Sequence, residues 1–425
     1  MSLFGYDQGL FSGVVVTEDF LVVHDLVGRS KTTTLSTVTA IYDVGCFFGA
    51  LVAFSIGERL GRKKSILLGT TLMAIGTLLK CTSYSLPQIF VGRVILGFGN
   101  GINTSTAPIW QTETSSPKWR GKLVFLEMVM NILGFSMVNW INYGLSFAGG
   151  AVAWRFPIAF QFMFIFVLFA TVPWLPESPR CPVDDPYVVA QKNEIEYTIN
   201  YERENAIRWR DIFRRRKTDS TDSKTLRRLI LGAGTQFMQQ FEGVNIMSYY
   251  LPTVLMQFVG LSDSMARLLT AVNSVTYLIC TCCAVGLIER MGRRGLMMLS
   301  TAGQFFAFLI ITILLRYAQA NANTPQGQKF GSASIVFFFL FYIFFGLGML
   351  EIPWLYPTEL NSYDGRTVLY SSSLIIVTLD AIDMNCPFYD SFNIFMPLIV
   401  LYQRSLAPRS HNVEPLDVYG TANLS

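Results

Sequence analysis

The stretch Gly57–Lys64 (GERLGRKK) follows a long apolar run, and Ile288–Arg294 (IERMGRR) follows a comparable run in the second half of the chain. A second pair of short stretches occurs in the same order, with Trp110–Glu113 (WQTE) in the first half and Tyr356–Glu359 (YPTE) in the second. One repeated element can arise by chance, but two in matching order seldom do. The repeats predict a duplicated chain with two halves of similar architecture.

Composition and the spacing of apolar runs place these halves in a membrane. Of the 425 residues, 51% are hydrophobic and 15% are charged, whereas soluble globular domains carry about 25% charged residues. Apolar runs of about 20 residues, the length that crosses a hydrocarbon core, recur along the whole chain. They speak against a soluble domain and predict ten clear spans and two weaker ones, at residues 3–23, 33–56, 66–83, 88–110, 122–147, 156–175, 228–258, 264–288, 296–316, 331–356, 367–382 and 392–403.

Basic residues gather in alternate connections between these spans. Because lysine and arginine are enriched in cytoplasmic loops, both termini are predicted to be cytoplasmic, and we expect the plasma membrane as the location. The fold expected is an all-α membrane protein with two pseudo-symmetric six-helix halves. The predicted domains are an N-terminal bundle (1–175), cytoplasmic linker helices (176–227), a C-terminal bundle (228–403, incomplete after about 361) and a tail (404–425).

Further motifs connect the repeats to a known family. They include Phe4–Gly9 (FGYDQG), Pro176–Arg180 (PESPR) and Gln239–Asn245 (QQFEGVN). Together with the paired Gly-Arg loops, they resemble the sugar-porter family of the major facilitator superfamily, most closely its fungal members, from Phe4 to about Asn361. The resemblance implies the major facilitator fold and alternating-access transport of a hexose, pentose or related polyol, either alone or by proton symport.

Asp7 is the strongest single candidate for a functional residue. A carboxylate inside a membrane span costs several kcal/mol unless it is paired or wetted, so such a residue is a functional candidate by default. Arg93, inside the fourth apolar run, is the expected partner. The resemblance implies that Asp7 takes up and releases the coupling proton and that Arg93 tunes its proton affinity. The plain alternative is an Asp7 that is solvated near the start of the chain.

A sugar site needs side-chain amides for the hydroxyls and an aromatic face for the ring. The seventh span supplies both, with Tyr249 one turn beyond Asn245 on the same helix face. The alternative for any one of these amides is a hydrogen bond between helices. By resemblance, the sugar-binding residues are Gln239, Gln240, Asn245, Tyr249, Asn273 and Trp354.

Acidic and basic residues in the cytoplasmic loops form a second expected set. Their side chains can make charge-assisted bonds to neighbouring helix ends, and the family implies a latch that holds the outward-open state. The alternative is charge that only sets the topology. The latch residues implied are Glu58, Arg62, Glu113, Arg120, Glu177, Arg180, Glu289, Arg293 and Glu359.

Other classes of site find little support. Cys280 and Cys283 form a lone CxxC within an apolar run, which favours helix packing over a metal site. No nucleophile–base pair suggests an enzyme, and we expect a monomer with no cofactor, no metal and no nucleic-acid partner. The partners expected are a sugar or polyol, protons and the lipid bilayer.

The sequence also departs from the family pattern. Met128 stands where the family usually has Gln, and Glu351 places a charge close to Trp354. After Asn361 the final two spans are not recognisable, and the first span starts late. These departures predict a transporter truncated or misassembled at both ends, with a sugar sensor or a nonfunctional fragment as the alternatives to a working carrier.

Overall fold

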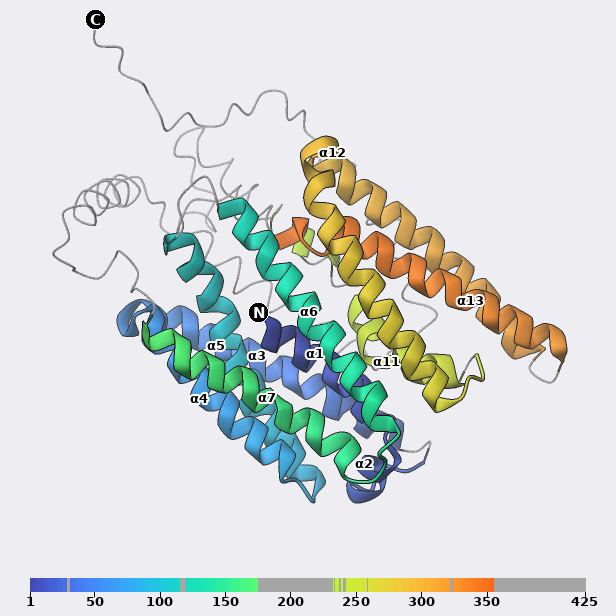
Figure 1. Cartoon of the computed structure of the whole chain (residues 1–425), viewed down its shortest axis with the longest axis horizontal. Helices are drawn as coiled ribbons and strands as arrows, with labels where there is room; N and C mark the ends of the chain where they lie inside the picture. The colour runs from blue at the N-terminus through green and yellow to red at the C-terminus, as the bar shows by residue number, and fades with distance from the viewer. Residues whose placement is uncertain are drawn as a thin grey trace, which may run out of the picture.

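The computed structural model describes residues 1–28, 31–114, 120–174, 232, 234–236, 238–239, 242–257, 259–321 and 324–354 (Figure 1). Every element within these ranges is helical, and none of them contains a strand. The predicted linker (176–227) and everything after Trp354 lie outside the described residues, so the predicted domain boundaries there stay predictions.

The first half consists of long helices joined by short connections. The predicted first span is divided, because α1 ends at Val14 and a separate short α2 follows. The elements are α1 (Ser2–Val14), α2 (Glu18–Val23), α3 (Thr32–Leu60), α4 (Arg62–Cys81), α5 (Leu86–Thr114), α6 (Arg120–Ser146), α7 (Val152–Thr171) and the 3₁₀ turn η2 (Val172–Trp174).

The second half has the same kind of helices with more irregular backbone. Helix α12 consists of two arms that meet at a kink at Gly292, and α13 runs directly into a π-helical turn. Its elements are α11 (Val244–Gln257), α12 (Asp263–Ala320), α13 (Pro325–Phe344) and η3 (Phe345–Met349).

The glycines of the repeated loops confirm that the two halves are built alike. Gly61 ends α3 with φ 86° and ψ 159°, and Gly292 kinks α12 with φ 71° and ψ 161°. Both values lie in the positive-φ region, which glycine enters at little steric cost. The GERLGRKK and IERMGRR stretches therefore make the same sharp turn at the same place between consecutive spans.

The distribution of apolar and charged side chains fits a protein surrounded by lipid. Within the described ranges, six helical segments are long and apolar enough to cross a membrane, in α3, α4, α7 with η2, both arms of α12, and α13 with η3. On α7, Phe166 is 73% exposed, whereas Asp7, Lys80 and Arg93 are at most 1% exposed. Apolar side chains thus face outward and charged ones inward, as expected when the solvent is hydrocarbon.

The two halves meet along α1, α6, α11 and α12. Helix α1 packs against α6 and α11, and α6 packs against α12. Within the first half, α1 and α6 approach each other closely at Gly5, where a Cβ would clash with the backbone oxygen of Asn131. Apolar clusters cross the boundary, since Phe135 of α6 packs in the core of the second half and Tyr249 of α11 in that of the first.

Candidate functional site

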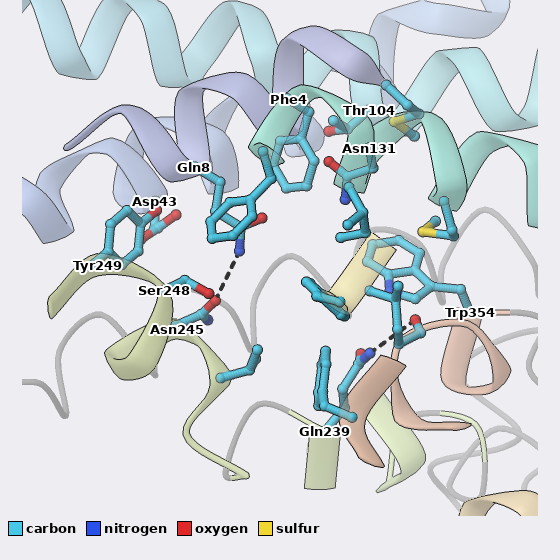
Figure 2. Close-up of a pocket in the computed structure, with 18 of the residues that line it drawn as sticks. Phe4, Gln8, Asp43, Thr104, Asn131, Gln239, Asn245, Ser248, Tyr249 and Trp354 are labelled. Atoms are coloured by element: carbon cyan, nitrogen blue, oxygen red, sulfur yellow. Dashed lines mark hydrogen bonds between the residues drawn. The ribbon is translucent and has the colours of Figure 1, made fainter. Parts of the chain in front are cut away.

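A cavity of about 90 Å³ lies between the two halves (Figure 2). Helices α1, α3, α5 and α6 line it from the first half, and α11, α12 and η3 line it from the second. Its wall is mainly apolar and aromatic, with a few polar side chains placed around it. These polar side chains are Gln8, Asp43, Thr104, Asn131, Gln239, Asn245 and Ser248.

Four of the six residues predicted to bind sugar line this cavity: Gln239, Asn245, Tyr249 and Trp354. They come together because Gly243, with φ 77°, interrupts the seventh span between Gln239 and Asn245. Gln240 lies outside the described residues. Asn273 is buried on α12 but does not line the cavity, so its role in sugar binding stays a prediction.

Two amides already make contacts that shape the site. The Nε2 of Gln239 donates to the backbone oxygens of Met349 at 2.5 Å and Leu350 at 3.3 Å, while its Oε1 has no partner among the described residues. The Nε2 of Gln8 donates to Oδ1 of Asn245 at 3.2 Å (Figure 2). The first contact holds the broken seventh span against η3, and the second joins the two halves across the cavity.

Several lining residues were not among the sequence predictions. Gln8, Thr104 and Ser248 contribute polar groups, and Met128 stands in the wall where the family usually has Gln. Gln8 belongs to the quoted FGYDQG motif and directly follows Asp7, which is the signal that could have found it. The others lie inside apolar runs whose orientation the sequence does not fix.

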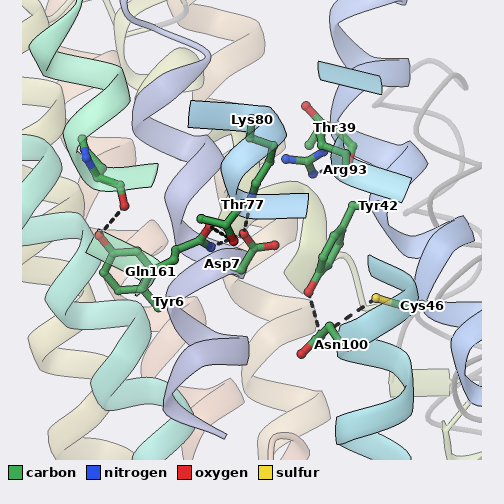
Figure 3. Close-up of polar contacts among 11 residues, drawn as sticks. Tyr6, Asp7, Thr39, Tyr42, Cys46, Thr77, Lys80, Arg93, Asn100 and Gln161 are labelled. Atoms are coloured by element: carbon green, nitrogen blue, oxygen red, sulfur yellow. Dashed lines mark hydrogen bonds and ion pairs between the residues drawn. The ribbon is translucent and has the colours of Figure 1, made fainter. Parts of the chain in front are cut away.

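Asp7 is buried within the first half and is ion-paired (Figure 3). The Nζ of Lys80, on α4, lies 3.0 Å from Oδ1 of Asp7. The same oxygen accepts a hydrogen bond from Nε2 of Gln161, whose Oε1 accepts one from Thr77 at 3.4 Å. Oδ2 of Asp7 has no partner within the described ranges. The alternative of a merely solvated Asp7 is therefore wrong in this structure.

The expected pair between Asp7 and Arg93 is not formed. The Nη2 of Arg93 donates to the backbone oxygen of Thr39 at 2.7 Å (Figure 3). The guanidinium lies 3.5 Å from the ring centroid of Phe11. Its Nε and Nη1 find no acceptor in the part of the chain described. The prediction paired Asp7 with the wrong cation. In the sequence, Lys80 lies near the end of an apolar run, where a lysine usually reaches the membrane surface. In the structure its side chain is instead fully buried against Asp7.

The predicted latch can be located only in part. Arg62 begins α4 directly after Gly61, and Arg293 follows Gly292 at the kink of α12. Glu177, Arg180 and Glu359 lie outside the described residues. The side chains of Glu58, Glu113, Arg120 and Glu289 also lie outside what the structure describes, so the latch stays a prediction.

Comparison with known proteins identifies the family to which the chain belongs. The family model described as "Sugar (and other) transporter" matches residues 1–379. The chain belongs to this family of the major facilitator superfamily. The match continues past Asn361, so the similarity extends further along the chain than its motifs indicate. The chain is thus a transporter-family protein, and its membership gives no support to a catalytic role.

Two fungal relatives of this family member illustrate the range of similarity. The MFS-type transporter oryC of Aspergillus oryzae is 67% identical over 387 residues, which cover 86% of this chain and 71% of the relative. The sugar transporter STL1 of Saccharomyces cerevisiae is 33% identical over 398 residues, which cover 86% and 67% respectively.

Solved structures share the fold. The proton:xylose symporter XylE, bound to 6-bromo-6-deoxy-D-glucose, superposes with a TM-score of 0.77 at 20% identity, over 96% of this chain and 93% of that one. The partially occluded inward-open form of XylE from E. coli gives a TM-score of 0.71 at 19% identity, over 96% of both chains. These likenesses establish the major facilitator fold.

Proposed function

We propose that this family member carries a sugar or related polyol, such as a hexose or pentose, across the plasma membrane by proton symport. The observation that supports it most is the cavity between the two halves, where Gln239, Asn245 and Trp354 combine amides with an aromatic ring. Secondary transporters of duplicated architecture bind substrate at the interface between their repeats. Amide groups can both donate to and accept from hydroxyls, and an aromatic face covers the apolar face of a sugar ring.

Asp7 is the proposed proton-binding residue of this symport. Its carboxylate is buried against Lys80, and protonation would remove the charge that holds this pair together. Arg93, whose Nε and Nη1 have no acceptor among the described residues, is the second cation that Asp7 could contact in another state of the cycle. Exchange of partners between Lys80 and Arg93 would then change the proton affinity of Asp7 as the halves move.

The position of Asp7 also suggests how proton and substrate are coupled. Asp7 and Gln8 are neighbours on α1, but Asp7 contacts α4 and α7 while Gln8 contacts Asn245 across the cavity. A shift of α1 that follows protonation of Asp7 would therefore move Gln8 at the substrate site. We further propose that both termini are cytoplasmic and that the cytoplasmic Glu and Arg residues form the latch. The transporting unit in this proposal is a monomer.

Uptake of radiolabelled D-glucose, D-xylose and glycerol, in cells that lack their own carriers, tests the proposal. We expect uptake of at least one of these compounds and a large loss of accumulation when a proton uncoupler is added. Asp7→Asn is expected to abolish accumulation while it spares exchange of labelled for unlabelled substrate. Accumulation that neither the uncoupler nor Asp7→Asn affects would contradict proton symport, and no uptake of any sugar or polyol would contradict the substrate class.

A further inference from the structure

A second buried carboxyl lies in the other half of the molecule, at Glu242. Its side chain is fully buried directly before Gly243, where the backbone turns with φ 77° and α11 then begins at Val244. One carboxyl oxygen accepts a hydrogen bond from Oγ1 of Thr301 at 3.3 Å. The amide of Gln304, one turn further along α12, lies beside it. Glu242 therefore faces α12 within the second half, away from the substrate cavity.

The surroundings of Glu242 differ from those of Asp7 in one decisive respect. Asp7 is paired with Lys80, whereas no cation of the described residues forms an ion pair with Glu242. The groups that contact its carboxyl from α12 are neutral, and no other titratable side chain in the described part of the chain acts on it. An isolated buried carboxylate is so costly that the group takes up a proton instead.

Two unpartnered oxygens at this position fit the protonated form. Oε2 of Glu242 and Oε1 of Gln304 both lack a partner among the residues described. An ionised carboxylate can only accept hydrogen bonds, whereas a carboxylic acid also donates one. The Thr301 hydroxyl already donates to the other carboxyl oxygen, so a proton on Oε2 of Glu242 adds a donor where these two acceptor oxygens have none.

Glu242 also sits where the helices are irregular. Gly243 breaks the seventh span, and the nearby Gln239 donates to the backbone oxygen of Met349 in the π-helical η3. On the other side, Ser300, next to Thr301, donates to the backbone oxygen of Phe344 at 2.6 Å. Single π-helical turns and broken helices are frequent at functional sites of transporters, because they absorb changes between states.

We propose that Glu242 is a second proton-binding site, which carries a proton through the transport cycle in addition to the one assigned to Asp7. In the state described, the carboxylic acid is held by Thr301 beside Gln304. When the junction of α11, α12 and η3 opens to water, the O–H bond breaks, the proton passes to water and the carboxylate keeps the electron pair. The coupling to transport rests on the proposed symport, but the protonated state of Glu242 does not.

Infrared spectroscopy of the purified full chain in lipid nanodiscs tests the protonated state without any substrate. A protonated carboxyl has a C=O stretching band that an ionised carboxylate lacks. At pH 7, we expect the wild type and Asp7→Asn to share such a band and Glu242→Gln to lose it. An identical band in Glu242→Gln would overturn the proposal, because the group would then be ionised in the wild type. Any band from the buried Glu127 and Glu351 is present in all three proteins and cancels when the spectrum of Glu242→Gln is subtracted from that of the wild type.

Accumulation at static head tests whether the proton moves. In proteoliposomes with the membrane potential clamped at zero and a gradient of one pH unit, each coupled proton supports an accumulation ratio of about tenfold. For the compound among D-glucose, D-xylose and glycerol that is taken up, we expect a limit of about 100-fold for wild type and about tenfold for Glu242→Gln. Glu242→Asp, which keeps a titratable group, is expected to retain more than the Gln variant does.

The outcomes separate this proposal from the general function. A ratio unchanged in Glu242→Gln would mean that the proton never leaves, and would overturn the second site while proton symport stands. If none of the three compounds is transported, the proposed function fails, and the infrared result still decides whether Glu242 is protonated.

Discussion

Gln8 and Asn245 connect the two halves of the protein across its central cavity, with Nε2 of Gln8 donating to Oδ1 of Asn245 at 3.2 Å. Gln8 lies on α1, next to the ion-paired Asp7, and Asn245 lies on α11, just after the break at Gly243. The contact thus spans the interface that would open and close in the proposed transport cycle. It also engages Asn245, one of the amides proposed to bind the substrate.

Replacing either amide should weaken substrate binding. Asn245→Ala and Gln8→Ala are each expected to raise the KM for uptake about 5- to 30-fold, which corresponds to about 1–2 kcal/mol of lost hydrogen bonding. Because the two side chains contact each other, the double variant should lose less than the sum of the single losses. Ser332→Ala, at an exposed position of α13, is the control. Fully additive losses would show that the two amides act independently.

Lys80 should be needed both for stability and for accumulation. Lys80→Met leaves Asp7 without its cation in a buried site, and breaking such a pair from one side costs about 3–5 kcal/mol. We expect a marked fall in the unfolding temperature of the purified protein, partly restored in the double variant Asp7→Asn/Lys80→Met. Accumulation should be lost in both variants. A Lys80→Met protein as stable as wild type would contradict the buried pair.

The sequence predicted the membrane class, the duplicated halves and four of the residues that line the cavity, because these depend on long patterns. Apolar runs, repeated loops and the QQFEGVN motif each involve many residues, so one exception does not obscure them. The Asp7 pairing depended on a single contact, and Lys80 is separated from Asp7 by more than 70 positions along the chain. Its burial is set by how α4 packs on α1 and α7, which neither hydropathy nor motif spacing encodes.

The position of Glu242 illustrates the same limit. The sequence places it inside the QQFEGVN motif, between Gln239 and Asn245, which both line the cavity. The turn at Gly243 instead separates it from the cavity and directs it to Thr301 on α12. A single glycine dihedral thus separates the motif's polar groups that line the cavity from the one that does not.

The matching glycines of the repeated loops should be sensitive to any side chain. Gly61→Ala and Gly292→Ala place a Cβ at φ 86° and φ 71°, a conformation that costs an L-residue roughly 1–2 kcal/mol. We expect both variants to lower the unfolding temperature by similar amounts. Gly286→Ala is the matched control, because Gly286 lies within α12 with open space around it and alanine favours a helix. If Gly292→Ala behaves like Gly286→Ala, the kink is not required.

His24 should make the folded protein less stable in acid. It follows α2, outside the candidate spans, with Nδ1 2.9 Å from the backbone oxygen of Phe20 and Nε2 3.0 Å from Oγ of Ser83. Burial lowers the pKa of His24 below its ordinary value of 6.5, with the Phe20 carbonyl opposing the shift and Arg155 adding to it. The unfolded chain therefore binds the proton more readily than the folded one. Stability is fully present above about pH 6.5 and is lost as the pH falls below that value.

Thermal unfolding of the purified protein between pH 7.5 and pH 5.5 measures this loss. His24→Gln removes the titrating group, so its unfolding temperature should fall less over this interval than that of the wild type. The chain has only two histidines, and His411→Gln provides the matched control, which we expect to follow the wild-type curve because His24 remains. If His24→Gln and wild type lose the same stability on acidification, the buried neutral imidazole is not the cause of the pH dependence.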